Sequence, residues 1–153
     1  MRVVPLCQLL DNYAYLVIDE SVGIAAVVDV AEAQPVVEAL GREGVRLVAI
    51  LSTHHHFDHV GGNEDLLAAL PAGSVEVFGY EGDRDRIPGL TRGLADGEEF
   101  LHRLGIGSEP LALLLEHADQ DGDLTLAGAT SGHQPKTELN ALGIRGPRLP
   151  IHP

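Results

Sequence analysis

Apolar residues recur along the first hundred positions in short runs that turn-forming residues separate. The runs that predict β-strands are residues 3–6, 14–18, 24–28, 47–51 and 75–79. The breaks between the first four fall at residues 11–12, at residues 21–23 and around a helical stretch that ends in residues 42–44. In that stretch, residues 33–42, Val36, Val37 and Leu40 recur at spacings of three and four, which predicts a helix.

A second helix is expected to begin at Asn63, whose side chain is of a type that caps helices. Glu64 and Asp65 suit its first turn, and Leu66, Leu67 and Leu70 are expected on its inner face. Two strands followed by strand–helix alternation predict an α/β layer. Polar residues that follow a strand of such a layer lie at its carboxyl edge, where sites form.

One polar segment there is unusually rich in metal-binding side chains. Residues 53–63, here called the histidine segment, read Thr-His-His-His-Phe-Asp-His-Val-Gly-Gly-Asn and directly follow the apolar run 47–51. In an extended chain His54 and His56 point the same way and could share one ion, whereas Asp58 and His59, past a bend, could reach a second. His55 points away from them, so we expect it to support the segment structurally.

The form His54-x-His56-x-Asp58-His59 resembles the signature of the metallo-β-lactamase fold. Within that superfamily, the whole histidine segment resembles glyoxalase II, the hydroxyacylglutathione hydrolases. Residues 11–19, Asp-Asn-Tyr-Ala-Tyr-Leu-Val-Ile-Asp, are similar to the opening hairpin of that family, and residues 26–29 to the strand that follows it. The resemblance covers residues 1–100. It implies an αββα fold of which this chain holds the first half-repeat.

The resemblance also implies a site and a reaction. His54, His56, Asp58 and His59 would bind two zinc ions, with iron or manganese as alternatives. Asp58 would in addition orient a metal-activated water that attacks the carbonyl of a glutathione thioester such as S-lactoylglutathione. Asp29 would support the metal ligands. No residue of this chain matches those with which the family binds glutathione.

The composition changes after Phe100, since every valine, tyrosine and phenylalanine lies within residues 1–100. We therefore expect a metallo-β-lactamase-like domain at residues 1–100 and a divergent, poorly ordered tail at residues 101–153. For the tail, the sequence predicts one helix at residues 110–117 and one weak strand at residues 124–127. The third histidine, bridging aspartate and last histidine of the family are not found there. The nearest match, residues 129–133, has Ala129 where a ligand histidine would stand.

These missing ligands leave two hypotheses open. The chain is a metal-dependent thioester hydrolase of the glyoxalase II type, or it is a truncated or alternatively ended relative that binds metal weakly or serves as an interaction partner. A sulfur dioxygenase on the same scaffold is disfavoured by Phe57, where those enzymes have a small residue.

The net charge and the composition limit the classes of molecule that this protein is expected to bind. The formal net charge of −13 argues against nucleic acid and anionic membranes. No apolar run is long enough to span a bilayer, and the single cysteine, Cys7, excludes an internal disulfide and is expected as a small buried side chain. We expect a cytoplasmic protein with a small-molecule substrate, whose half-repeat leaves sheet edges open to self-association.

Overall fold

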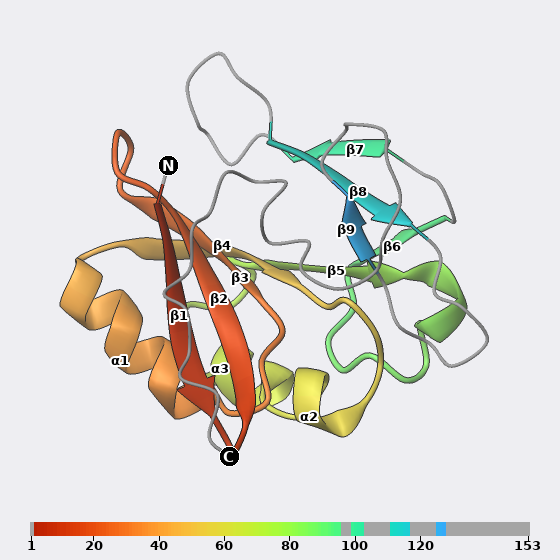
Figure 1. Cartoon of the computed structure of the whole chain (residues 1–153), viewed down its shortest axis with the longest axis horizontal. Helices are drawn as coiled ribbons and strands as arrows, with labels where there is room; N and C mark the ends of the chain where they lie inside the picture. Colours follow the sequence, from red (N-terminus) through yellow and green to blue (C-terminus); the bar gives the residue numbers. More distant parts are fainter. Residues whose placement is uncertain (1, 96–98, 103–110, 117–124, 128–153) are drawn as a thin grey trace, which may run out of the picture.

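The computed structural model describes residues 2–95 and, beyond them, the backbone of residues 99–102, 111–116 and 125–127 (Figure 1). The strands are β1 (Arg2–Gln8), β2 (Asn12–Asp19), β3 (Ile24–Val28), β4 (Arg46–Leu51), β5 (Glu76–Tyr80), β6 (Arg92–Leu94), β7 (Glu99–His102), β8 (Leu111–Glu116) and β9 (Thr125–Ala127). The helices are α1 (Ala33–Glu43), α2 (Phe57–Val60), α3 (Asn63–Ala68) and the 3₁₀ turn η1 (Glu81–Asp83). The α/β class expected from the sequence is confirmed.

Strands β1 to β6 form one mixed sheet whose spatial order is the order along the chain. β1, β2 and β3 pair antiparallel, with Leu6 opposite Ala14 and Leu16 opposite Val27. β3, β4, β5 and β6 pair parallel. The amino end of β2 therefore lies at the same edge of the sheet as the carboxyl ends of β3, β4 and β5.

Alternate residues of a strand point to opposite faces of the sheet. Both faces are apolar because both sets of alternate residues are apolar in strands such as β3. In β3, Ala25 and Val27 belong to the core cluster that includes Val36 and Leu40 of α1 and Leu66 of α3. Ile24, Ala26 and Val28 belong to a second cluster, together with Phe78 and Leu94. Helices α1 and α3 lie on the first of these faces (Figure 1).

The tip of the β1–β2 hairpin is fixed to the segment that follows β3. Gln8 is 2% exposed, and its Oε1 accepts hydrogen bonds from the backbone N–H groups of Ala31 at 2.6 Å and Glu32 at 3.1 Å. Its Nε2 donates to the carbonyl of Glu32 at 3.2 Å. A buried amide satisfied in this way holds two loops in a single arrangement. The hairpin is thereby placed beside the histidine segment.

Three features within residues 2–95 differ from the expectations. Asn63 does not cap α3. The N-cap is Gly62, and the fully buried Asn63 side chain donates from Nδ2 to Ser52 Oγ at 3.3 Å and to the carbonyl of Pro88 at 3.2 Å. Cys7 is exposed rather than buried, because it lies on the outward side of the edge strand β1. The short elements α2, η1 and β6 were not expected.

The expected helix at residues 110–117 is wrong. Residues 111–116 form β8, which pairs antiparallel with β7 and with β9. The run Leu-Ala-Leu-Leu-Leu-Glu favours a helix locally, but pairing with two neighbouring strands overrides such weak preferences. β7 crosses the expected boundary at residue 100. Residues 129–133, the nearest match to the missing ligand segment, lie outside the described residues.

Among the described residues, no helix is long and apolar enough to cross a membrane.

Candidate metal centre

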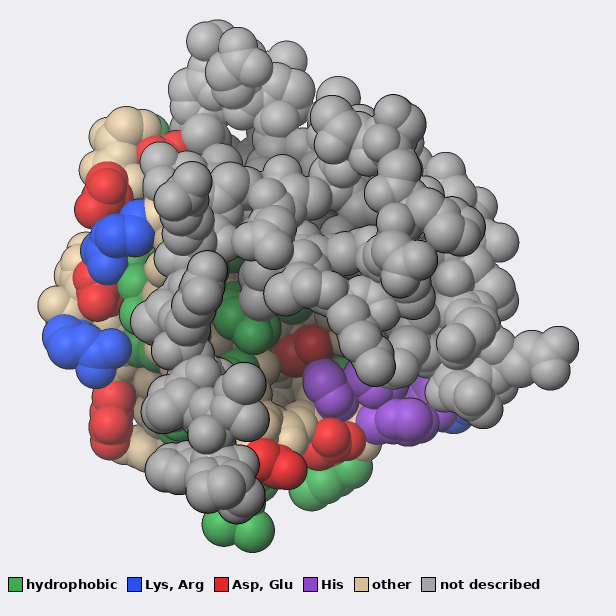
Figure 2. Space-filling view, viewed as in Figure 1, with side chains coloured by type: hydrophobic (Ala, Val, Ile, Leu, Met, Phe, Trp, Pro, Cys, Tyr) green, Lys and Arg blue, Asp and Glu red, His purple; other side chains and the backbone are tan. Residues whose placement is uncertain are grey.

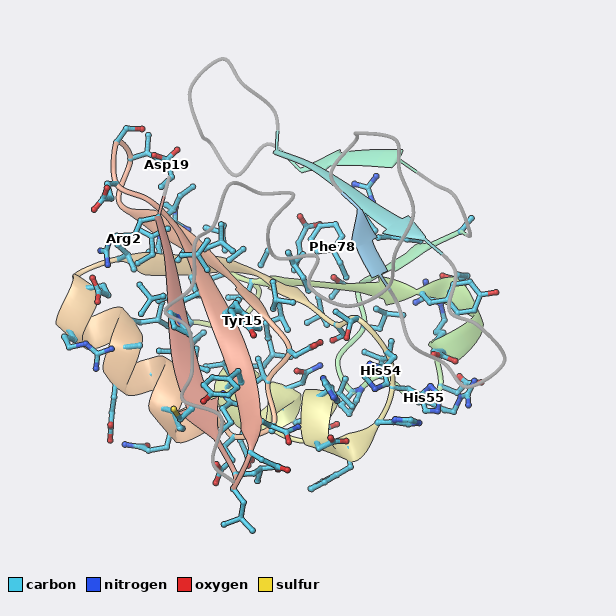
Figure 3. All side chains as sticks on the ribbon, in the orientation of Figure 1. Arg2, Tyr15, Asp19, His54, His55 and Phe78 are labelled. Carbon is cyan, nitrogen blue, oxygen red and sulfur yellow. The ribbon has the colours of Figure 1, made fainter. Side chains whose placement is uncertain are left out.

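Four segments that are distant in sequence meet at the edge of the sheet where β3, β4 and β5 end. Asn12 begins β2, Asp29 follows β3, the histidine segment follows β4, and Asp83 lies in η1 after β5. His54 and His55 lie at this end of the sheet, and Asp19 lies at the opposite end of β2 (Figure 3). Figure 2 shows histidine side chains gathered on the surface there, with acidic side chains beside them. This edge is where α/β sheets place their sites.

The three histidines expected as ligands form one cluster. The ring centroid of His54 lies 4.6 Å from that of His56 and 4.1 Å from that of His59. Asp58 Oδ2 lies 3.4 Å from His59 Nε2. His54 is 5% exposed, whereas the side chains of His59 and Asp58 are 27% and 49% exposed. The residues expected at two separate ions are therefore mutual neighbours within one group that opens to solvent.

The carboxylate of Asp29 orders this group. His59 Nδ1 lies 2.9 Å from Asp29 Oδ2 and must donate to it, because a carboxylate only accepts. Thr53 donates to the same carboxylate from its backbone N–H at 2.8 Å and from Oγ1, which lies 3.0 Å from Oδ1 and 2.8 Å from Oδ2. Since the hydroxyl proton of Thr53 is committed to Asp29, His54 Nδ1 donates to Thr53 Oγ1 at 3.0 Å. In neutral His54 and His59, Nε2 is then the unprotonated nitrogen.

Asp29 itself lies in a strained backbone conformation. Its φ is 54°, in the left-handed region that aspartate and asparagine tolerate better than most residues. Its N–H donates to the carbonyl of Leu51 at 3.0 Å, and the next residue, Val30, donates to the carbonyl of His59 at 2.6 Å. The backbone after β3 is thus bonded to the last residue of β4, Leu51, and to His59 within the histidine segment.

Asn12 orients Asp58 from the opposite side. Its Nδ2 donates to the carbonyl of Asp58 and to Asp58 Oδ2, each at 2.9 Å. The hydrogen bond from Asn12 is the largest cause that holds the pKa of Asp58 below its ordinary value. Asp58 is thereby kept in the anionic form that a metal ligand needs.

We expect Asn12→Ala to raise the pKa of Asp58 in the metal-free protein, because it removes a donor that favours the carboxylate. A lowered pKa contributes stability at pH values above the ordinary carboxyl pKa of 3.8, and that contribution disappears as the pH falls through the lowered value. The variant should therefore lose less stability on acidification over this range. Carboxyl ¹³C shifts followed against pH would measure the change.

A reciprocal control is available at the other end of β2. Ser21 donates to Asp19 Oδ1 and is the main cause that lowers the pKa of Asp19. Ser21→Ala should raise the pKa of Asp19 and leave that of Asp58 unchanged. The same pKa for Asp58 in the Asn12→Ala variant and in the parent would contradict the prediction.

The donor chemistry fits a divalent ion, because imidazole nitrogens and a carboxylate are the ligands that zinc, iron and manganese accept. An outer carboxylate sets the tautomer of His59 directly and that of His54 through the hydroxyl of Thr53, an arrangement common for metal-bound histidines. Among the described residues, however, no group of three or more His, Cys, Asp or Glu side chains stands in ligating geometry. The part of the chain described here thus brings together side chains of the types that bind divalent metals, without three of them in ligating geometry.

The family model of the metallo-beta-lactamase superfamily matches residues 9–137 of this chain. The chain belongs to this superfamily. Among similar proteins, the hydroxyacylglutathione hydrolase of Gloeobacter violaceus (strain ATCC 29082 / PCC 7421) is 44% identical over 133 residues, which are 87% of this chain and 50% of that protein. The hydroxyacylglutathione hydrolase of Synechococcus sp. (strain JA-2-3B'a(2-13)) is 52% identical over 106 residues, 68% of this chain and 41% of the relative. The chain thus spans about half the length of these relatives.

Solved structures confirm the metallo-β-lactamase fold. The BLEG-1 B3 metallo-beta-lactamase superposes with a TM-score of 0.59 at 22% identity, covering 80% of this chain and 64% of that one. The di-iron-bound form of TTHA1623 gives a TM-score of 0.53 at 22% identity, covering 92% and 82%. At this identity, both establish the fold alone.

The resemblance to the superfamily and to its hydroxyacylglutathione hydrolases, expected from the histidine segment and the hairpin, is therefore confirmed. The assignment of His54, His56, Asp58 and His59 as ligands stays a prediction, as do the supporting roles of His55 and Asp29. The structure adds Asn12, Thr53, Asp83 and Arg86, which sequence reasoning did not place at the site. Asn12 and Thr53 had a signal, because Asn12 lies in the family-like hairpin and Thr53 begins the histidine segment.

Proposed function

We propose that this metallo-β-lactamase superfamily chain carries the amino-terminal part of the metal centre of a thioester hydrolase acting on glutathione thioesters, with S-lactoylglutathione hydrolysed to lactate and glutathione. Its similarity to the hydroxyacylglutathione hydrolases supports the substrate class. The observation that carries the proposal is the shared carboxylate of Asp29, which bonds directly to His59 and, through Thr53, to His54.

In this proposal His54, His56, Asp58 and His59 hold zinc. When bound, the metal would polarise the thioester carbonyl and lower the pKa of a bound water. Asp29 and Thr53 keep the Nδ1 protons of His59 and His54 directed away from the metal. Asn12 holds Asp58 Oδ2, which keeps the aspartate in a fixed orientation as an anion. These contacts arrange the ligands before substrate binds, which is how catalytic sites avoid reorganisation during the reaction.

The test is metal content together with thiol release. Protein purified without a tag and loaded with Zn²⁺ should release glutathione from S-lactoylglutathione, as followed with a thiol reagent, and a chelator should abolish the release. Asp58→Asn should lower the rate by about 10²-fold, since it removes a ligand and a candidate proton acceptor. Asp65→Asn is the matched control, because Asp65 is an exposed carboxylate of α3, outside the histidine cluster.

The two hypotheses from the sequence give different results in this experiment. Bound Zn²⁺ with thiol release supports the hydrolase. Bound Zn²⁺ without thiol release would overturn the hydrolase and favour a non-catalytic metal-binding relative. Equal rates in Asp58→Asn and Asp65→Asn would overturn the role proposed for Asp58.

A further inference from the structure

His55 lies between two candidate ligands but has a different set of contacts. Its ring stands edge-on to that of His56, with centroids 5.1 Å apart and an angle of 74° between the planes. Its side chain is 23% exposed. Both of its nitrogens contact the connection between β5 and β6, residues 81–91. In Figure 3 the ring of His55 lies beyond that of His54, farther from the strands.

The partners of His55 define its tautomer. Nε2 lies 3.0 Å from Arg86 Nη1, and a guanidinium only donates, so Nε2 accepts. Nδ1 lies 2.9 Å from Asp83 Oδ2, and a carboxylate only accepts, so Nδ1 carries the proton. Arg86 also donates from Nη2 to Asp83 Oδ1. The three side chains close a ring of hydrogen bonds in which both edges of the imidazole are held.

The connection is itself rigidly anchored. Asp83 is 7% exposed, and its backbone carbonyl accepts from Arg86 N at 2.8 Å and from Ile87 N at 2.9 Å. Ile87 is 3% exposed and packs over Gly79 of β5, where its Cδ1 lies 2.6 Å from the position that a Cβ would take. Thr91 returns to β5 through bonds between its Oγ1 and both the N–H and the carbonyl of Val77. The Asp83 carboxylate is therefore presented from a fixed support.

Other side chains of the described residues bond to the histidine segment on either side of His55. Asp29 bonds to Thr53 and His59, and Asn12 bonds to Asp58. Between these points, within the described residues, the side-chain hydrogen bonds of residues 55–57 are those of His55 with Asp83 and Arg86. The backbone that joins His54 to His56 is thus bonded, through His55, to the β5–β6 connection.

We propose that Asp83 and Arg86 are positioning residues, which hold His55 in one tautomer and orientation and thereby set the spacing between the candidate ligands His54 and His56. This inference rests on the proposed function, because spacing matters only if these histidines bind a metal. Asp83 and Arg86 would act through His55, to which both bond. Outer hydrogen-bond partners of this kind change metal affinity by about 10- to 100-fold when removed.

The first test is made on the metal-free full-length chain. Long-range ¹H–¹⁵N spectra should show His55 protonated on Nδ1 in the parent. Because Asp83 alone would still favour a proton on Nδ1, the double variant Asp83→Ala/Arg86→Ala removes both partners, and the ring should then become a mixture of tautomers. Arg84→Ala is the matched control, since Arg84 lies on the same turn and its side chain bonds to the exposed Glu81. An unchanged His55 tautomer in the double variant would overturn the inference.

The second test measures Zn²⁺ affinity by competition with a chromophoric chelator. Arg86→Ala should bind about tenfold more weakly than the parent, and Arg84→Ala should bind as the parent does. In a His55→Phe background, Arg86→Ala should cause no further loss, because the coupling passes through His55. Equal losses in both backgrounds would overturn the inference. Failure of the parent to bind Zn²⁺ would instead count against the proposed function, and the tautomer measurement would then decide this inference alone.

Discussion

Replacing Asp29 by alanine should both weaken metal binding and destabilise the fold. The substitution leaves the Thr53 N–H and the His59 Nδ1–H without their acceptor, and for such part-buried donors the cost is about 1 kcal/mol each, the lower end of the range for buried groups. Alanine also fits poorly at a φ of 54°, at a cost of about 1–2 kcal/mol. We expect the free energy of unfolding to fall by about 3 kcal/mol and Zn²⁺ affinity by about 10- to 100-fold.

Asp29→Asn separates these two effects. Asparagine tolerates the left-handed region and keeps the shape of the side chain, but its single acceptor oxygen cannot serve both Thr53 and His59. This variant should keep most of the stability and lose Zn²⁺ affinity. Urea unfolding followed by circular dichroism and chelator competition would measure the two quantities. Parent-like affinity in both variants would show that Asp29 does not order the ligands.

Gly62→Ala should be strongly destabilising, although its backbone φ of −90° suits any residue. A Cβ at this position would lie 2.9 Å from three backbone atoms, the nitrogens of Ala33 and Glu32 and the carbonyl carbon of Glu32. Backbone cannot move aside as a flexible side chain can, and Gly62 N also donates to the carbonyl of Val30 at 2.9 Å. Overpacking of this kind costs about 1–3 kcal/mol, and we expect the upper end.

Gly41→Ala is the control for this prediction. Gly41 lies within α1, and a Cβ there meets no atom within 4 Å. The same substitution should therefore stabilise the protein by up to about 1 kcal/mol, the difference in helix propensity between glycine and alanine. Opposite signs for the two variants in urea unfolding would support the structure. A Gly62→Ala variant as stable as the parent would contradict the packing of residues 32–33 against the histidine segment.

The strands and the first helix were predictable because local pattern and tertiary structure agree there. Ile24 to Val28 was expected and observed with identical bounds, since a continuous apolar run between turns suits a strand buried on both faces. At Leu111 to Glu116 the two disagree, because a leucine-rich run that favours a helix is paired as a strand. The role of Asn63 was missed for a similar reason, since its local capping preference yields to buried partners at Ser52 and Pro88.

The site was predictable as far as it is contiguous in sequence. The histidine segment is recognisable from its residue types and their spacing, and the supporting role of Asp29 was expected from the family resemblance. Arg86 and Asp83 carry no such signal, because an Asp and an Arg three residues apart are common on exposed turns. Only the parallel pairing of β4 with β5 brings their turn beside His55. Contacts between loops of adjacent strands depend on register, which a single sequence does not specify.

Because each strand of the main sheet lies next to its neighbour in sequence, this half of the protein can be assembled in the order in which it is synthesised. Every new strand leaving the ribosome meets an open edge already formed, so no early strand has to wait for a distant partner. The histidine segment is an exception to this order. It emerges after Asp29 but before Asp83 and Arg86, so His55 gains its contacts with them about thirty residues later, at separations of 28 and 31 positions. Metal captured during synthesis would meet a segment already bonded to Asn12 and Asp29 and not yet to Asp83 and Arg86.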